Sequence, residues 1–337
     1  MTAEIKPRID FEGRTRLETV IPLSTPYLVF LDPSSACNAK CKWCPTGSGR
    51  AEAYYNPGVM QWILYKKIIA DLAAMPEPVK TLRLYKDGEP LLNDSLPKMV
   101  AHAKSTRRFK RIDTTTNGIL LTPSKSRALA ESGLDVLIIS VPQRWTKQYL
   151  SRVKYFYEAS AGRTGVYCKI IGDGLSQTEK DMFMESFFGC CDRIFIENLS
   201  PCWPEFTVNG VQRVGIYGQP VTEPPNVCPY IFYSMAINSD GSVSLCFLDW
   251  MHGVIVGNAA RESIAGIWSG HKLRSYQYAN LRGMRKCFPL CDRCGQLEYG
   301  APDNIDTHTA KILENMENAG AAKSRQAAGF IRQRETC

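Results

Sequence analysis

The feature that most constrains the fold is an alternation of strand-like and helix-like segments over the first two-thirds of the 337-residue chain. The expected strands are Tyr27–Asp32, Thr81–Tyr85, Arg111–Thr115, Val136–Val141, Val166–Ile171 and Arg193–Glu197. The helix-like segments between them are Gln61–Met75, Asp94–Ser105, Pro123–Ser132, Lys147–Glu158 and Ser176–Phe188. This order predicts an α/β fold, in which a parallel sheet with right-handed crossovers curls into a full or partial barrel. In such barrels the chemistry lies at the carboxyl ends of the strands.

The sequence changes character near Pro201, where prolines become frequent and the alternation ends. Farther on, β-type runs at Met235–Asn238 and Ser242–Phe247 flank a turn that contains Gly241, which predicts a β-hairpin. A helix is expected over Ser263–Tyr278. We therefore divide the chain into an N-terminal extension (1–24), a barrel (25–200), a second small domain (201–302) and a helical tail (303–337).

Composition narrows the class of partner. The formal net charge is +8, but the basic residues are scattered, so a solvated basic surface or an anionic substrate is expected rather than a nucleic-acid face. No apolar run is long enough to span a bilayer, and the polar N-terminus has no apolar export segment. We expect a cytoplasmic protein without a membrane partner. Its thirteen cysteines are not expected to form disulfides, and those that are grouped suggest metal or redox chemistry.

The first cysteine group is Cys37, Cys41 and Cys44, directly after the first expected strand. Three thiolates on one loop can ligate three irons of a cubane cluster and leave the fourth iron open. The alternative is a zinc loop that takes a distant fourth ligand, although zinc motifs usually come as CxxC pairs. The polar turns Tyr85–Pro90 and Thr114–Gly118 end the next two strands at the same edge of the sheet. This arrangement favours iron and a ligand-binding site.

In combination, the CxxxCxxC loop, the Gly-Glu-Pro after the second strand and the Thr-Asn-Gly after the third resemble the radical S-adenosylmethionine (SAM) superfamily. The resemblance covers roughly residues 25–200 and implies a partial (β/α)6 barrel. It also implies a [4Fe–4S] cluster whose open iron binds the amino and carboxylate groups of SAM. By position it implies these cofactor-binding residues: Trp43, Gly88, Glu89, Asn117, Ser140 and Arg152.

Individual roles follow from the same resemblance. Gly88 and Glu89 are expected near the methionine amino group, Trp43 near the adenine, and Asn117 and Ser140 near the ribose or carboxylate. Arg152 and Arg144 are candidate carboxylate partners, and a solvated helix face explains either arginine about as well. Asp87 is a departure, because the family often has glycine before Gly-Glu; the shape of this turn is therefore open.

The second cysteine group comprises Cys228, Cys246, Cys291 and Cys294. Four thiolates can enclose either a structural zinc or an electron-transfer [4Fe–4S] cluster, and the chemistry alone does not decide between them. After a radical SAM barrel, this spacing resembles the SPASM/twitch domain. The resemblance is to the shorter twitch form, which holds one auxiliary [4Fe–4S] cluster. Aminocyclitol dehydrogenases have this form, and the chain is also similar to sugar-modifying relatives. Cys287 could replace one of the four ligands.

Cys202 lies just past the last barrel strand, near the expected mouth of the barrel. A thiol in this position could donate a hydrogen atom to a substrate radical, as an epimerase requires. The remaining cysteines are expected to be small buried hydrophobes or surface thiols.

The resemblance implies a radical SAM oxidoreductase of the dehydrogenase or epimerase type. It would reductively cleave SAM and abstract hydrogen from a small-molecule substrate, a sugar or aminocyclitol, with a flavodoxin- or ferredoxin-type electron donor. Two other functions stay open. One is a maturase of ribosomal peptides, and the other is a non-enzymatic zinc-binding adaptor.

Overall fold

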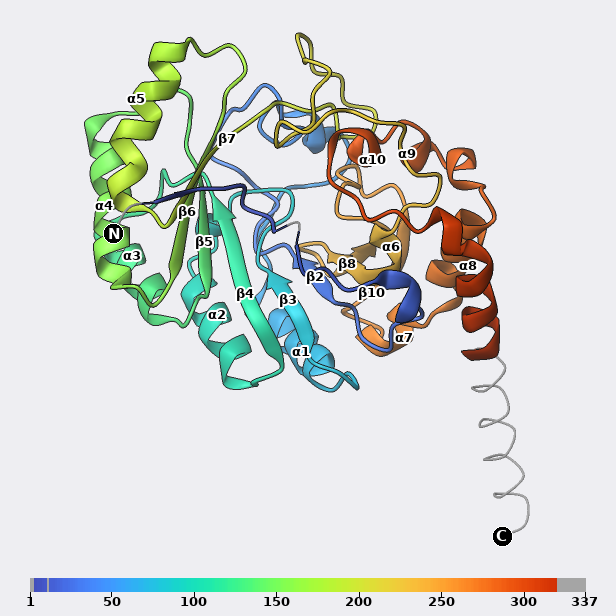
Figure 1. Ribbon diagram of the computed structural model, residues 1–337. Coiled ribbons are helices and arrows are strands. Elements are labelled where there is room, and N and C mark those ends of the chain that lie inside the picture. The colour runs from blue at the N-terminus through green and yellow to red at the C-terminus, as the bar shows by residue number, and fades with distance from the viewer. Residues whose placement is uncertain (1–2, 11, 320–337) are drawn as a thin grey trace.

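The computed structural model describes residues 3–10 and 12–319 (Figure 1). At its centre is one sheet with the strand order β1-β7-β6-β5-β4-β3-β2-β8-β9-β10. The strands are β1 (Glu4–Ile5), β2 (Leu28–Leu31), β3 (Val79–Arg83), β4 (Phe109–Thr116), β5 (Val136–Ser140), β6 (Gly165–Ile171), β7 (Arg193–Glu197), β8 (Ser234–Ile237), β9 (Ser242–Ser244) and β10 (Ile255–Asn258). Strands β2 to β7 are parallel neighbours in sequence order, as a partial barrel requires.

The crossover helices confirm the predicted α/β alternation. They are α1 (Trp62–Ala73), α2 (Leu96–Ser105), α3 (Pro123–Glu131), α4 (Lys147–Ser160) and α5 (Gln177–Phe187). Ser176 begins α5 with a capping box that includes Glu179, and Thr122 caps α3 in the same way through its side-chain oxygen. Figure 1 shows these helices along one side of the sheet and the C-terminal elements gathered on the other.

The two faces of the parallel sheet differ in chemistry because successive side chains of a strand point to opposite faces. The outer face packs on the helices with fully buried apolar residues, such as Leu31, Leu82 and Ile112. The opposite positions on the same strands carry Arg83, Asp113 and other polar groups. This face of β3 and β4 therefore carries charged groups, which line a cavity and do not belong to the apolar core.

The region after Pro201 does not form a separate sheet. β8 pairs in parallel with β2, and β9 pairs antiparallel with β8, so the predicted hairpin extends the barrel sheet. Small helices surround this hairpin: α6 (Tyr230–Tyr233), α7 (Ile264–Trp268), α8 (His271–Leu281), α9 (Pro289–Asp292) and α10 (Gln296–Tyr299).

The single helix predicted over Ser263–Tyr278 was wrong. The segment forms α7 and α8 with a break at Ser269-Gly270, because the backbone of Gly270 is extended (φ −72°, ψ 155°) and cannot continue the helix. In the predicted tail, residues 309–319 are helical and place Ile312 and Met316 in the core, while residues 320–337 lie outside the described part. Within residues 3–10 and 12–319, no helix combines the length and apolar character that crossing a bilayer requires.

Candidate cluster-binding site

The cysteine triad lies in the loop that follows β2, at the carboxyl edge of the sheet. Burial raises the pKa of the Cys41 thiol, and the neighbouring Cys37 adds to this effect. The pKa of Cys44 is likewise raised, first by burial and then by Cys41. The three thiols are thus close enough to interact electrostatically, in a partly buried setting where their thiolates need a positive partner.

Gly88 fits against the backbone of the cysteine loop. A Cβ at this position would overlap the carbonyl oxygens of Ser34 and Ala36, so only glycine allows the two turns to meet. The next residue, Glu89, donates its backbone N–H to the Ala36 oxygen at 2.8 Å. The backbone that Gly88 meets is that of the cysteine loop itself, and the expected approach of this turn to a ligand amino group stays a prediction.

Glu89 links the ends of β3 and β4. Its buried carboxylate accepts hydrogen bonds from Thr116 Oγ1 at 2.6 Å and from the Asn117 backbone N–H at 2.7 Å. Asn117 in turn donates through Nδ2 to Asn38 Oδ1 at 2.8 Å, next to Cys37. The Glu89 carboxylate therefore orients Asn117 toward the cysteine loop. Direct contact of Glu89 with a ligand amino group stays a prediction.

The other predicted cofactor residues are spread around the same edge. Ser140 ends β5 and is the register partner of Lys169 on β6. Arg152 donates from Nη1 to the carbonyl of Ile119, just past the Thr-Asn-Gly turn, so it supports this turn. Trp43 is half-buried within the cysteine loop, and Arg144 is exposed. Their contacts with a cofactor remain predictions.

These residues fit a cluster better than a single ion. Within the part of the chain that the structure describes, no three His, Cys, Asp or Glu side chains converge to hold one metal ion. A tetrahedral zinc would need sulfur atoms roughly 3.8 Å apart, given Zn–S bonds near 2.3 Å. Three thiolates on one loop instead match the ligand set of a [4Fe–4S] cluster that leaves one iron open.

The second cysteine group also comes together in the structure. The pKa of Cys228 is raised to about 12 by burial and then by Cys294, and burial together with Cys294 raises the pKa of Cys291 to about 11. Burial and the other three thiols raise the pKa of Cys246 as well. Cys287, by contrast, is exposed. The geometry favours the quartet with Cys291 and Cys294 as the auxiliary ligands, an assignment that we propose.

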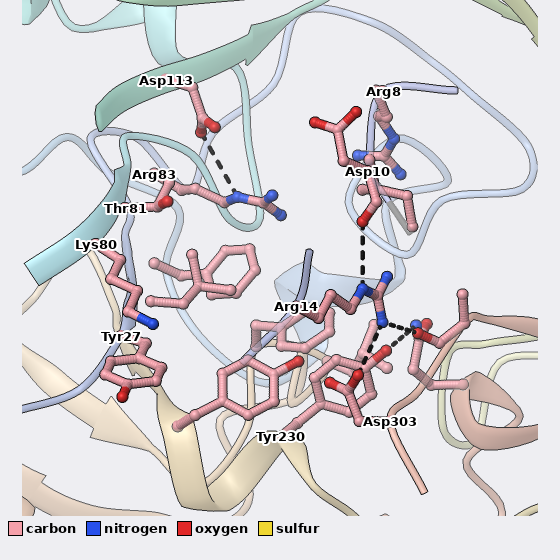
Figure 2. Close-up of a pocket in the computed structure, with 18 of the residues that line it drawn as sticks. Arg8, Asp10, Arg14, Tyr27, Lys80, Thr81, Arg83, Asp113, Tyr230 and Asp303 are labelled. Carbon is pink, nitrogen blue, oxygen red and sulfur yellow. Dashed lines mark hydrogen bonds and ion pairs between the residues drawn. The ribbon is translucent and has the colours of Figure 1, made fainter. Parts of the chain in front are cut away.

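A cavity of about 570 Å³ extends between the barrel interior, the N-terminal segment and the C-terminal domain (Figure 2). Its lining includes Cys202, Trp203 and Phe247, the residue that follows Cys246. The Cys202 carbonyl accepts a long contact of 3.8 Å from Cys294 Sγ. The cavity therefore adjoins the auxiliary cysteines, and burial raises the pKa of the Cys202 thiol to about 11, which keeps it protonated at neutral pH.

The departure at Asp87 has a structural role. Its buried carboxylate pairs with Lys86 Nζ at 2.7 Å and with His252 Nε2 at 2.9 Å. Lys86 also donates to the backbone oxygen of Asp249, and His252 stacks on Tyr55 with ring centroids 4.0 Å apart. These contacts join the turn after β3 to the loop after Cys246. A glycine at position 87 has no side chain and could not make the contact with His252.

Asp32, at the end of β2, escaped the sequence-based prediction. It is fully buried, and neither carboxylate oxygen has a hydrogen-bond partner among the described residues. Burial and the neighbouring Asp87 raise its pKa to about 8. An acidic residue at the end of an apolar strand was the one signal in the sequence. The charged lining at Arg8, Arg83 and Arg111 was also missed, although alternation along β3 and β4 places the latter two inside the barrel.

Comparison with known proteins agrees with this geometry. Residues 31–144 match the radical SAM superfamily, and residues 228–295 match SPASM, an iron–sulfur cluster-binding domain. The chain is 22% identical over 281 residues to an S-adenosyl-L-methionine-dependent 2-deoxy-scyllo-inosamine dehydrogenase of Niallia circulans, covering 83% of this chain and 96% of the relative.

Solved structures show the same fold. BtrN in complex with AdoMet and 2-DOIA aligns with a TM-score of 0.55 at 19% identity, over 83% of this chain and 97% of BtrN. Streptococcus suis SuiB bound to precursor peptide SuiA aligns with a TM-score of 0.54 at 16% identity, over 84% of this chain and 73% of SuiB. The family matches and the two cysteine groups lead to one conclusion: the chain belongs to the radical SAM superfamily and carries a C-terminal SPASM domain, so that it is an enzyme that uses SAM and iron–sulfur clusters.

Proposed function

We propose that this enzyme oxidises a secondary alcohol of a sugar or aminocyclitol. When bound, SAM and the clusters supply the carbon radical that abstracts hydrogen and an acceptor for the second electron. The substrate carbon would lose one hydrogen atom, and then one electron and one proton, to become a ketone. The relative that acts on an aminocyclitol aligns with 83% of this chain over 96% of its own length, which supports this substrate class.

One observation carries the proposal. The cavity that opens into the barrel is also lined by Phe247 and Cys202, which adjoin the auxiliary cysteines. The lining also includes Lys86, in the turn that meets the cysteine loop at Gly88, so a substrate held there would lie beside the auxiliary cysteines and this turn. The aromatic lining, with Tyr85, Tyr230 and Trp203, suits the apolar faces of a sugar ring and excludes water from the reacting carbon.

The electron donor and the compartment belong to the same proposal. A small flavodoxin- or ferredoxin-type protein would supply the electrons. The free cysteines of the described chain suit a reducing compartment, so we place the enzyme in the cytoplasm. An anaerobic assay with reduced flavodoxin that forms 5′-deoxyadenosine would support this part. No 5′-deoxyadenosine with reduced flavodoxin, from enzyme that cleaves SAM with dithionite, would argue against this donor.

Replacing Cys202 and following solvent deuterium together distinguish oxidation from epimerisation. If the enzyme oxidises its substrate, Cys202→Ala should keep ketone formation, and the product made in D2O should carry no deuterium at the reacting carbon. A thiol that quenches the substrate radical would instead introduce solvent deuterium, and its loss would abolish the product. Deuterium in the product of the unchanged enzyme would overturn the oxidation proposal. Trp203→Phe, at the adjacent lining position, is the matched control.

The peptide-modifying alternative has one observation in its favour, the structural likeness to a maturase that binds a precursor peptide. The two functions are separated by incubating the reconstituted enzyme with a panel of aminocyclitols and nucleotide-linked sugars, each deuterated on the ring. Transfer of deuterium into 5′-deoxyadenosine supports the small-molecule proposal. SAM cleavage that none of these compounds stimulates would contradict it.

A further inference from the structure

The cavity is lined by more cationic than anionic side chains. Its basic residues are Arg8, Arg14, Lys80, Arg83, Lys86 and Arg111, and its acidic residues are Asp10, Asp113 and Asp303. Several of these basic side chains form ion pairs with carboxylates. Arg8 pairs with the buried Glu197 at 2.7 Å, Arg14 pairs with Asp303 at 3.3 Å, and Lys86 pairs with Asp87.

The remaining cations are Lys80, Arg83 and Arg111. Asp113 is the one carboxylate beside two of them, Arg83 and Arg111. Arg111 Nε donates to Asp113 Oδ2 at 3.1 Å, and Arg83 Nε lies 3.6 Å from Asp113 Oδ1, which is too far for a hydrogen bond. Arg83 Nε and Asp113 Oδ1 are both buried without a hydrogen-bond partner among the described residues. Lys80 Nζ donates to Thr15 Oγ1 at 2.7 Å and lies over the Tyr27 ring, with no carboxylate of its own in the described chain. Three cations thus face one anion.

These cations lie in one part of the cavity. Leu28, Thr81 and Arg111 are register partners on neighbouring strands. Arg83 lies two residues after Thr81 on β3, where its register partner is Asp113. Figure 2 shows Arg83 extending into the cavity from β3 while Arg14 enters from the N-terminal segment on the opposite side. We name Lys80, Arg83 and Arg111 the basic floor. Lys80 and Arg111 lie toward the amino ends of β3 and β4, and Arg83 is the last residue of β3.

Two members of the basic floor, Lys80 and Arg111, lie far from the cysteine triad along their strands. Arg111 precedes Thr116, the last residue of β4, by five positions, which corresponds to about 16 Å of strand at 3.3 Å per residue. The Thr-Asn-Gly turn and the cysteine loop begin beyond that end. A ligand that touches both regions must be long, with its reactive carbon near the carboxyl edge and its anionic group on the floor.

From this geometry we infer that the substrate carries a phosphoryl group, as in a nucleotide-linked or phosphorylated sugar, and that Lys80, Arg83 and Arg111 bind it. This inference rests on the proposed function and specifies its substrate. The terminal nitrogens of two guanidinium groups offer the forked donors that phosphate oxygens prefer, and the Lys80 ammonium adds a point charge. A cavity of about 570 Å³ has room for more than a single sugar ring.

The first test is equilibrium binding of inorganic diphosphate to the anaerobically reconstituted enzyme. Lys80→Gln combined with Arg83→Gln should weaken binding by about tenfold or more, the loss expected when charged hydrogen bonds are removed. Lys311→Gln removes the same charge at an exposed position and should leave binding unchanged. Arg83→Lys keeps the charge and should restore part of the affinity. Equal diphosphate affinity in all four proteins would overturn the inference.

The second test compares ligands, with SAM cleavage in the absence of substrate as the readout of the radical SAM function. UDP-glucose should bind the unchanged enzyme more tightly than free glucose, and raising the salt concentration should reduce this difference. Glucuronate binding as tightly as UDP-glucose would contradict the choice of phosphoryl over carboxylate. The Lys311 variant should retain this basal cleavage. Its absence from the unchanged enzyme would contradict the proposed function instead, so the two failures are distinguishable.

Discussion

At the scale of single residues, the site depends on small groups in close contact. Gly88 allows the turn after β3 to lie against the cysteine loop, and the carboxylate of Glu89 fixes the next turn through Asn117. The sequence predicted the position of these residues. It could not show that the Glu89 carboxylate accepts hydrogen bonds from Thr116 and Asn117, because these bonds depend on the register between β3 and β4.

Replacing Gly88 by alanine should displace the cysteine loop. A methyl group there meets two backbone oxygens that cannot move aside, and such overpacking costs about 1–3 kcal/mol. We expect iron content to fall toward that of one cluster and SAM cleavage to drop by more than tenfold. Gly58→Ala, in the same loop but with no atom near the added carbon, is the control. Normal iron content and cleavage in the Gly88 variant would contradict this packing argument.

Asp32 should make stability depend on pH. Its pKa is raised by burial, so the folded state retains a proton that the unfolded chain has released. Stability from this group is complete below the ordinary carboxyl pKa and is lost as the pH rises toward about 8. The loss is at most about 1.4 kcal/mol per pH unit in this window.

Asp32→Asn should remove that part of the dependence. We expect the midpoint of thermal unfolding of the variant holoenzyme to fall less between pH 6 and pH 8 than that of the unchanged enzyme. Asp94→Asn, at an exposed carboxylate, should leave the slope as it is. Parallel slopes in all three proteins would show that Asp32 is ionised in the folded state.

At the scale of elements, the parallel strands and their helices were predictable because the apolar pattern of each element is local. The predicted β7 coincides with the observed one, Arg193–Glu197, and the predicted α3 differs by one residue at its end. The pairing of β8 with β2 was not predictable, since it joins residues more than two hundred positions apart. The split between α7 and α8 follows from the extended backbone of Gly270, which the apolar pattern of the segment does not reveal.

The tie between Asp87 and His252 joins the turn after β3 to the C-terminal domain. Asp87→Asn leaves two buried basic side chains without their carboxylate, and breaking such a buried pair costs about 3–5 kcal/mol. We expect faster amide hydrogen exchange in residues 249–254 of the variant.

A double-mutant cycle isolates this contact. If Asp87 and His252 act as a pair, combining Asp87→Asn with His252→Gln should cost less than the sum of the separate changes. Strict additivity would mean that each side chain stabilises its own loop independently. Exchange in α5, far from the tie, is the internal control.

At the scale of the whole molecule, three parts of the chain enclose one cavity. The N-terminal segment, the barrel interior and the C-terminal domain each contribute lining residues, such as Arg8, Arg83 and Phe247. The two cysteine groups were recognisable from spacing alone. The cavity was not, because its wall combines residues of the N-terminal segment, the barrel strands and the C-terminal domain that only the folded chain brings together.

The central claim is that Cys37, Cys41 and Cys44 hold the cluster that binds SAM, apart from the auxiliary quartet. The most direct measurement is anaerobic 5′-deoxyadenosine formation by the variant with all three changed to alanine, with iron determined on the same sample. The account predicts about four irons per chain, against about eight in the unchanged enzyme, and no detectable 5′-deoxyadenosine. SAM cleavage by this variant at the rate of the unchanged enzyme would contradict it.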